Sequence, residues 1–424
     1  MLQVAFIRQN TELVKQKLSI RNYNHLEIVD EILLFDDEVK NLKNKIEHIQ
    51  MQVNSKSDQI QKLMKNNQKE EALATRNEVS SLKELLAIEK PALEQAIKSL
   101  EAKLILLPNL PHNSVPAGAT PEENEIVREG GTKPALYKDA VPHWELAKKY
   151  DLINFELGNK ITGSGFPVYK NKGAKFQRAL IQYFLDYNTS AGYVEYMPPL
   201  LVNESTAYGT GQLPDKEGQM YHVTLDGYYL IPTAEVPVTN IYRDEILKES
   251  ELPVKMTAYT PCFRREAGSY GKDVRGLNRL HQFDKVEIIQ LAHPEKSYDV
   301  IEEMVNHVEK LLQSLELPYR LLRLCGGDMS FTSALTYDFE VYSAAQEKWL
   351  EVSSVSNFET FQSNRMKIRF KNQDNKTQLV HSLNGSSLAL PRIVASLLEN
   401  NQNENGIRLP KVLHNYFGAS SIEI

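Results

Sequence analysis

Apolar residues recur at alternating spacings of four and three through much of the first hundred residues of this 424-residue chain. A first series runs from Ile28 to Leu63, and a second runs from Val79 to Leu107. A repeat of this kind, kept over about five heptads, is typical of a coiled-coil helix. The polar stretch Lys65–Glu71 (KNNQKEE) separates the two series. Two similar seams around one short polar break predict a hairpin of two long antiparallel helices.

Lysines gather on the outer part of this predicted hairpin. Seven lysines and only two acidic residues, Glu47 and Asp58, lie between Lys40 and Lys69. A stiff and locally basic finger can follow a phosphate backbone with salt-dependent affinity. The same charges also suit a solvated helix face, and the seams alone suit a plain dimerisation coiled coil. The pattern itself leaves these three interpretations open.

The chain changes character after the hairpin. Residues 108–133 are rich in Pro, Gly, Asn and Ser without periodicity, which predicts a linker. Residues 134–424 then combine helical patterns, such as Ala174–Tyr187, with short β-like runs, among them Gly227–Val238. Strands in runs with helices at the edges predict an α+β domain on an antiparallel sheet. We therefore expect a helical domain at residues 1–107, a linker, and an α+β domain after it.

Composition argues against several classes of protein. Two cysteines, Cys262 and Cys325, cannot build a disulfide framework or a four-cysteine zinc site, so we expect a cytoplasmic protein without zinc. No apolar run approaches the ~18–20 residues of a membrane span, and the early charges do not suit a secretory signal. The formal net charge of −6 gives no global sign of nucleic-acid binding. Any RNA contact must therefore come from local patches.

A cluster of cations lies in the predicted β-hairpin Phe263–Glu287. Its members are Arg264, Arg265, Lys272, Arg275 and Arg279. Arginine forks hold phosphate bidentately, and an aromatic ring such as that of Phe283 can stack on a nucleobase. Strand alternation puts Arg264 beside Glu266, and Phe283 on one face with Glu287, which can hold an ammonium group. Walker and Gly-rich βαβ motifs are absent, so side chains on an open sheet would have to hold a nucleotide. A solvated charged turn is the alternative.

Three ordered motifs resemble those of class II aminoacyl-tRNA synthetases of the seryl type. Residues 192–202 (GYVEYMPPLLV) resemble motif 1, the dimer-interface motif, and residues 263–283 (FRREAGSYGKDVRGLNRLHQF) resemble motif 2. Residues 383–400 resemble motif 3, a strand that enters a helix. Shorter family pieces match at Tyr208–Pro214, Thr233–Pro237 and Ser356–Met366. The chain is thereby identified as a member of the bacterial-type seryl-tRNA synthetase family.

The resemblance implies an activity and a set of partners. The implied enzyme is a serine–tRNA ligase that uses ATP to attach serine to tRNA(Ser) through seryl-adenylate, and that also charges tRNA(Sec). Mg²⁺ is implied as the cofactor of ATP, and a homodimer without membrane association as the assembly. The implied architecture is an antiparallel catalytic sheet flanked by helices, with a helical arm that recognises the long variable arm of tRNA by its backbone shape.

The resemblance also implies roles for individual residues. Arg264, on the α-phosphate and the serine carboxylate, and Arg392, on the γ-phosphate, are the implied catalytic residues, and Phe283 stacks on adenine. The implied ATP site comprises Arg264, Arg265, Glu266, Phe283, Glu351, Val352, Ser353, Ser354 and Arg392. The implied serine site comprises Thr233, Ala234, Glu235, Arg264, Glu287, Asn384 and Ser386.

The implied Mg²⁺ ligands conflict with simple strand geometry. The family pattern assigns the metal to Glu351 and Ser354. Strand alternation instead places Ser353 on the face of Glu351. A local β-bulge would bring Glu351 and Ser354 to the same face.

Three other functions would leave different traces in the sequence. A sister class II enzyme for threonine or proline is expected to show other appended domains and a different pocket. A synthetase-like paralogue that charges a carrier protein is expected to lack the arm, whose heptads are present here. A non-catalytic RNA-binding scaffold is expected to have lost one of Arg264, Glu351 or Arg392, and all three are present. All three therefore explain the sequence less well than the ligase does.

Overall fold

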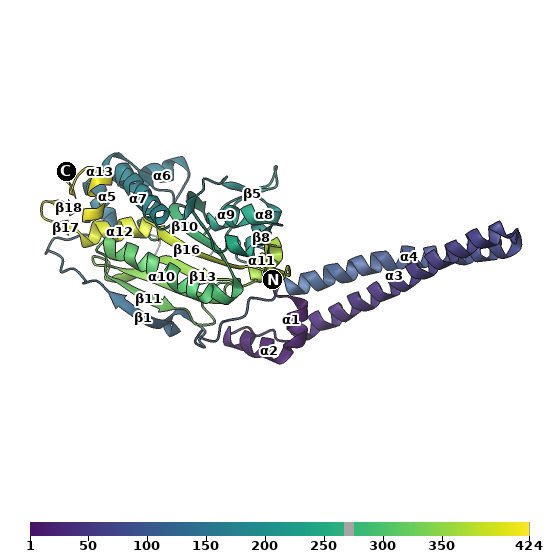
Figure 1. The fold of residues 1–424 in the computed structure, drawn as a ribbon. Helices are drawn as coiled ribbons and strands as arrows, with labels where there is room; N and C mark the ends of the chain where they lie inside the picture. The colour runs from purple at the N-terminus through teal and green to yellow at the C-terminus, as the bar shows by residue number, and fades with distance from the viewer. Residues whose placement is uncertain (267–274, 424) are drawn as a thin grey trace. The chain divides into compact units, whose positions relative to one another are not determined.

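The computed structural model describes residues 1–266 and 275–423. Lys272, one of the five cations of the predicted hairpin, lies outside the described residues. Backbone contacts divide the chain into two compact units (Figure 1). The first comprises residues 1–19 and 23–108, and the second comprises residues 20–22 and 109–424. Within the described ranges, no helix is both long enough and apolar enough to span a bilayer.

The first unit is the predicted helical hairpin. Its helices are α1 (Val4–Gln9), α2 (Thr11–Ile20), α3 (Ile28–Lys65) and α4 (Lys69–Leu104). The long helices α3 and α4 pack through the apolar seams, which bury Ile49, Val53, Val79 and Leu86 between them. The heptad prediction is therefore confirmed.

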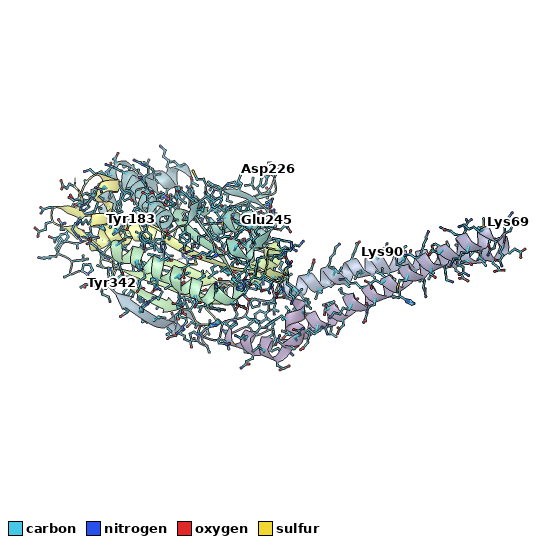
Figure 2. The ribbon with its side chains drawn as sticks, viewed as in Figure 1. Lys69, Lys90, Tyr183, Asp226, Glu245 and Tyr342 are labelled. Carbon is cyan, nitrogen blue, oxygen red and sulfur yellow. The ribbon has the colours of Figure 1, made fainter. Side chains whose placement is uncertain are left out.

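Ion pairs across the hairpin mark the register of its two helices. Lys45 Nζ lies 2.6 Å from Glu89 Oε1, and Lys56 pairs with Glu78. Other lysines of the arm, including Lys69 at its tip (Figure 2), are exposed. Part of the basic charge therefore stabilises the hairpin itself, and part faces solvent.

An eight-stranded sheet organises the second unit. All neighbouring strands pair antiparallel except β4 and β9, which are parallel. In spatial order the strands are β1 (Glu125–Gly130), β11 (Tyr319–Arg323), β12 (Leu335–Ser343), β13 (Lys348–Asn357), β16 (His381–Ala389), β10 (Gln282–Ala292), β9 (Val254–Phe263) and β4 (Val194–Glu195). The predicted α+β class with an antiparallel sheet is confirmed.

Smaller sheets and helices surround this sheet (Figure 1). The smaller sheets use β2 (Ile153–Asn154), β3 (Val168–Tyr169), β5 (Leu201–Asn203), β6 (His222–Val223), β7 (Tyr228–Leu230), β8 (Ile246–Lys248), β14 (Arg369–Lys371), β15 (Thr377–Leu379), β17 (Gln402–Asn403), β18 (Gly406–Arg408) and β19 (Ser421–Ile422). The helices are α5 (His143–Lys149), α6 (Phe155–Ile161), α7 (Asn171–Ser190), α8 (Glu204–Thr210), α9 (Glu235–Thr239), α10 (Ser297–Ser314), α11 (Phe361–Met366), α12 (Leu390–Asn400) and α13 (His414–Phe417).

Side-chain alternation along the strands separates a packed face of the sheet from an open one. On β10, Val286 and Ile288 join the main core with apolar residues of α7, α10 and α12. Phe283, Lys285 and Glu287 alternate with them and line a large cavity on the other face. Burial of the apolar alternate residues thus forces the charged ones into the cavity.

The β-like run Gly227–Val238 is not a continuous strand. Only β7 is extended, and the helix α9 follows it. Thr233 Oγ1 accepts a hydrogen bond of 3.3 Å from the backbone N–H of Glu235, which favours a helical start, and proline is tolerated in a first helical turn. The β-branched residues Val236 and Val238 are both fully buried in this helix, so tertiary packing overrides their strand propensity.

Candidate active site

A cavity of about 910 Å³ lies over the open face of the sheet. The strands β10, β12, β13 and β16, with α9 and the start of α12, all supply polar residues to its lining. Predicted site residues that line it are Thr233, Glu235, Arg264, Glu266, Phe283, Glu287, Glu351, Val352, Ser353, Ser354, Asn384, Ser386 and Arg392. Residues that are more than 150 positions apart in the chain therefore meet around one space.

Two predicted site residues do not line the cavity. Ala234 is fully buried in a neighbouring apolar cluster with Val238 and Met256. Arg265 is exposed, and its backbone N–H donates to the carbonyl of Gln219 at 2.9 Å. The Ala234 side chain thus packs away from the cavity, and the Arg265 side chain lies on the opposite side of the chain from Arg264; the predicted site roles of both stay predictions.

Arg264 and Phe283 form the aromatic end of the cavity. The guanidinium carbon of Arg264 lies 5.2 Å from the centroid of the Phe283 ring, within the range of a cation–π contact. The backbone N–H of Arg264 donates to the carbonyl of His281 at 2.9 Å, which continues the pairing of the two strands. Nearby, Arg279 Nη1 lies 3.3 Å from Glu266 Oε2. A planar cation thus lies over an aromatic ring at a place where a flat heterocycle could join them.

Glu235 and its partner Gln362 form a buried acidic corner. The Gln362 amide donates to Glu235 Oε1 at 2.7 Å and to the carbonyl of Thr210 at 3.1 Å. Burial raises the pKa of Glu235 to about 7, against the opposing effect of the Gln362 hydrogen bond. Gln362 was not predicted as a site residue, although it lies in the family piece Ser356–Met366, because its helix α11 has no strand alternation with the cavity residues.

Glu287 lies beside this corner with two polar neighbours. Lys285 Nζ lies 2.5 Å from Glu287 Oε2, and the Asn384 amide donates to Glu287 Oε1 at 3.1 Å. Sequence reasoning assigned no role to Lys285. Its position two residues from both Phe283 and Glu287 on one strand was the signal that would have found it.

A β-bulge resolves the conflict over Glu351 and Ser354. Phe339 pairs with Ser353 and Glu340 pairs with Glu351, so Val352 is an extra residue in β13. Glu351 and Ser354 therefore lie opposite Glu340 and Asp338, which share one face of β12. The Ser353 hydroxyl is otherwise engaged, since it donates to the carbonyl of Ser386 at 2.6 Å. The expected bulge is present.

Oxygen atoms gather beside this bulge. The Oδ1 atom of Asp338 is buried, and among the described residues it has no hydrogen-bond partner. Burial raises the pKa of Asp338, and the nearby Glu351 carboxylate raises it further. In residues 1–266 and 275–423 no three His, Cys, Asp or Glu side chains form a metal cage. A cation here would have few protein ligands, which is how Mg²⁺ binds beside phosphates.

Arg392 lies in the first turn of α12, and its guanidinium donates hydrogen bonds to two other segments of the chain. Its Nε donates to the carbonyl of Asn278 at 3.1 Å, and its Nη1 donates to the carbonyl of Glu351 at 2.7 Å. The same Nη1 lies 3.7 Å from Glu351 Oε2. The guanidinium is therefore oriented by backbone groups at the edge of the cavity.

Comparison with known proteins supplies the family. The family model of the seryl-tRNA synthetase N-terminal domain matches residues 1–111, and that of the tRNA synthetase class II core domain (G, H, P, S and T) matches residues 221–401. A serine–tRNA ligase from Salinibacter ruber is 48% identical over 424 residues, which cover 100% of this chain and 99% of the relative. The chain belongs to the seryl-tRNA synthetase family. A serine–tRNA ligase of Neisseria meningitidis serogroup B, 45% identical over 99% of this chain and 98% of the relative, agrees.

Solved structures of the seryl-tRNA synthetase family share the fold. The enzyme from Pyrococcus horikoshii, solved in complex with ATP, superposes with a TM-score of 0.92 at 33% identity, over 100% of this chain and 99% of that one. A cytoplasmic serine–tRNA ligase from Naegleria fowleri gives a TM-score of 0.88 at 24% identity, which shows the fold alone. The family membership and the class II synthetase fold predicted from the motifs are therefore confirmed.

Proposed function

We propose that this chain activates serine with ATP and transfers the seryl group to tRNA(Ser). The observation that carries the proposal is the single cavity that joins Arg264 and Phe283 to the buried carboxylates Glu235 and Glu287. A flat base and an ammonium group are the ligands that these two ends suit. Relatives of 43–48% identity named serine–tRNA ligase support this assignment.

In the proposed first step, a serine carboxylate oxygen attacks the α-phosphorus of ATP, and the bond to the bridging oxygen breaks as pyrophosphate leaves with its electron pair. Arg264 would bind the α-phosphate and the serine carboxylate, and Arg392 would bind the γ-phosphate. Phe283 would stack on adenine, with Glu266 at the adenosine end. Little proton transfer is needed, so positioning and charge neutralisation dominate the rate.

The serine pocket would use Glu235 and Glu287 for the ammonium group. A bound cation favours an ionised carboxylate, so serine would release the proton that burial favours on Glu235. Thr233, Asn384 and Ser386 would serve the serine hydroxyl. A pocket with polar partners for a hydroxyl rejects alanine strongly, because those partners would be buried without a hydrogen bond.

Glu351 and Ser354 would hold Mg²⁺, with Asp338 close behind them. The fit rests on the bulge that aligns the two residues and on the partnerless Oδ1 of Asp338 within the described chain. Mg²⁺ neutralises and orients the triphosphate when it is bound. Arg392 lies beside this place and would share the charge of the leaving pyrophosphate.

The proposed assembly is a cytoplasmic homodimer with one tRNA-binding arm in each subunit. Motif 1 exposes the apolar side chains of Val194, Met197 and Leu201, with Met197 89% exposed, which suits an interface between two copies. Both cysteines are free, as suits a reducing compartment. We propose a tRNA-binding domain at residues 1–107 and a catalytic domain at residues 134–424; most of the predicted linker 108–133 belongs to the second compact unit, where β1 pairs with β11.

The arm is proposed to bind the long variable arm of tRNA(Ser) through the phosphate backbone. Exposed lysines at its outer end support this, since they can contribute sequence-independent affinity. Recognition of backbone shape would extend to tRNA(Sec), and we propose it as a second substrate on that ground.

The deciding experiment is ATP–pyrophosphate exchange with each amino acid, followed by charging of total tRNA and of separate tRNA(Ser) and tRNA(Sec) transcripts. We expect exchange with serine, none above background with alanine, and charging of both transcripts. Exchange without tRNA charging would favour an enzyme for a carrier protein. Absence of serine-dependent exchange would overturn the proposed ligase, and failure with tRNA(Sec) alone would remove only the second substrate.

A further inference from the structure

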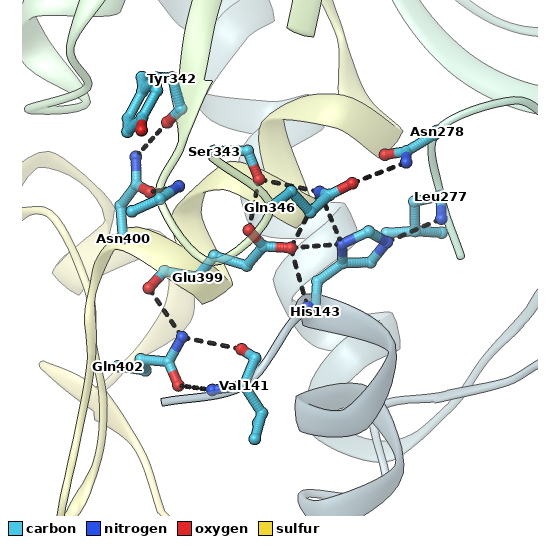
Figure 3. Close-up of polar contacts among 11 residues, drawn as sticks. Val141, His143, Leu277, Asn278, Tyr342, Ser343, Gln346, Glu399, Asn400 and Gln402 are labelled. Atoms are coloured by element: carbon cyan, nitrogen blue, oxygen red, sulfur yellow. Dashed lines mark hydrogen bonds and ion pairs between the residues drawn. The ribbon is translucent and has the colours of Figure 1, made fainter. Parts of the chain in front are cut away.

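A buried polar network joins α5 to α12 (Figure 3). His143 and Glu399 are both fully buried, and His143 Nδ1 lies 2.7 Å from Glu399 Oε1. The backbone N–H of His143 also donates to Glu399 Oε1 at 2.9 Å, and the Ser343 hydroxyl donates to Glu399 Oε2. Burial would raise the pKa of Glu399, yet these hydrogen bonds lower it. Glu399 is thus a carboxylate held ionised in the interior by its donors.

The second ring nitrogen of His143 accepts a different hydrogen bond. The backbone N–H of Leu277 donates to His143 Nε2 at 2.9 Å. An amide N–H can only donate, so Nε2 carries a lone pair, and the proton lies on Nδ1 facing Glu399. The two bonds together select one neutral tautomer of the ring. His143 therefore links a buried carboxylate to the main chain of the segment 275–279.

The segment 275–279 fits closely onto α5. Gly276 has a φ of +71°, and a Cβ there would come within 2.2 Å of His143 Nε2. The guanidinium carbon of Arg275 lies 4.7 Å from the centroid of a Trp144 ring, and Arg275 Nη2 lies 3.3 Å from Glu145 Oε1. Glycine is thus required at position 276 by both conformation and space, and three consecutive residues of α5 hold the segment.

The same segment holds Arg392. Asn278 follows Leu277, and its carbonyl accepts from Arg392 Nε at 3.1 Å. The Asn278 side-chain amide donates to Gln346 Oε1 at 2.8 Å, and Gln346 in turn donates to Glu399 Oε1 at 3.0 Å. Hydrogen bonds from the buried His143–Glu399 pair thus reach Leu277 and Asn278, and the main-chain carbonyl of Asn278 contacts the guanidinium at the edge of the cavity.

We infer that His143, oriented by Glu399, is a positioning residue for Arg392. The hydrogen bond from the Leu277 N–H to His143 Nε2 holds the main chain of residues 277–278 in position. The Asn278 carbonyl, which accepts a hydrogen bond from Arg392, is thereby placed to orient the guanidinium. His143 does not line the cavity, so it acts only through the segment. The inference rests on the proposed function for the role of Arg392 in binding the triphosphate. If His143 had only a structural role, its substitution would instead lower ATP binding and serine binding equally.

Two variants of His143 separate its two hydrogen bonds. His143→Asn keeps a donor near the position of Nδ1 and removes the acceptor for Leu277, whereas His143→Gln places a carbonyl oxygen near the position of Nε2. We expect His143→Asn to weaken ATP binding about tenfold, by calorimetry with ATP, and to raise the KM for ATP in exchange by a similar factor. His143→Gln should stay within about threefold of the parent, and neither should change the KM for serine.

Gly276→Ala tests the same link without altering His143 or Glu399. A Cβ at this position would push the segment away from the ring, so the ATP-selective loss should recur. In an Arg392→Ala background, His143→Asn should then add little to the ATP defect, because the group that it positions is gone.

The deciding comparison is between the change in ATP affinity and the change in the KM for serine. Unchanged ATP affinity in both His143→Asn and Gly276→Ala, equal losses for ATP and serine, or full additivity with Arg392→Ala would overturn the inference. Calorimetry with ATP needs no serine reaction. If the enzyme showed no serine-dependent exchange, the proposed function would therefore be wrong. The ATP affinity of the variants would still decide the inference about His143.

Discussion

Lys285 and Glu287 form an ion pair inside the cavity, with 2.5 Å between Nζ and Oε2 and with side chains only 7% and 1% exposed. They are two residues apart on β10, so the pair spans one step of the strand face. Removing both charges from water is costly, and the attraction between them offsets this only if the remaining polar atoms also find partners. The Asn384 amide supplies one such partner to Glu287. The carboxylate is therefore held in place before any ligand arrives.

Replacing Lys285 should expose the cost of this buried charge. Lys285→Met leaves Glu287 without its cation, and we expect a loss of about 3–5 kcal/mol of unfolding free energy, measured by urea denaturation. Lys367→Met is the matched control, because its 3.9 Å pair with Asp244 is largely exposed and should matter little. Equal effects of the two substitutions would show that the Lys285–Glu287 pair has no special weight.

Local patterns in the sequence were sufficient for the long elements. Heptads predicted α3 and α4 because their seams bury only each other, and alternation predicted β9 and β10 together with the shared cavity face of Phe283 and Glu287. In each case the signal and the burial lie in the same short stretch of chain. Such elements need no knowledge of distant residues.

Other parts of the site depend on contacts between distant residues. The run at 227–238 contains β-branched residues typical of strands, yet burial of Val236 and Val238 favours a helix there. The partnership of Glu235 with Gln362 joins residues more than a hundred positions apart. The bulge at Val352 is set by pairing with β12, and only the resemblance to the family suggested it. No period in the sequence encodes these contacts.

The ionisation of Glu235 should make stability depend on pH. Burial raises its pKa from 4.5 to about 7, so the folded chain holds this proton more tightly than the unfolded chain does. The stability that comes from the proton is full below about pH 4.5 and is lost as the pH rises through about 7. A pKa difference of this size corresponds to about 3 kcal/mol.

Glu235→Gln removes this dependence while keeping an acceptor for Gln362. The stability of the variant relative to the parent should improve by about 2–3 kcal/mol from about pH 5 to about pH 8, measured by urea denaturation at each pH. The exposed Glu94 of α4 offers a control in Glu94→Gln, which should show no such trend. Parallel stability profiles for Glu235→Gln and the parent would contradict a raised pKa.

Arg264 should matter for its shape as well as its charge. Arg264→Lys keeps one positive charge but loses the planar fork that lies over the Phe283 ring. We expect serine-dependent exchange to fall by more than about tenfold, which is about 1.4 kcal/mol of transition-state stabilisation. The thermal midpoint should stay near that of the parent, and Arg178→Ala on the exposed side of α7 should leave exchange intact. Exchange at the parent level in Arg264→Lys would contradict the proposal that Arg264 binds phosphate bidentately.

The arm should be dispensable for activation and essential for charging. Lys45 pairs with Glu89 and Lys56 with Glu78, so residues 50 and 84 lie opposite each other and deletion of residues 50–84 shortens both helices equally. With a short Gly-Ser turn in their place, exchange should be unchanged and charging of tRNA(Ser) should fall to background. Full charging by the shortened chain would contradict the proposal that the arm is needed for tRNA charging but not for serine activation.

Charge at the outer part of the arm should set the salt dependence of tRNA binding. The exposed lysines Lys43, Lys62, Lys65 and Lys69 can each neutralise a phosphate, whereas Lys45 and Lys56 are engaged in pairs within the hairpin. Each phosphate contact contributes about 0.7–0.9 to the slope of log affinity against log salt concentration. Replacing the four exposed lysines by Gln should therefore lower the slope by about 3, measured by filter binding of tRNA(Ser) over a salt series. The same slope as in the parent would mean that these lysines form only a solvated face.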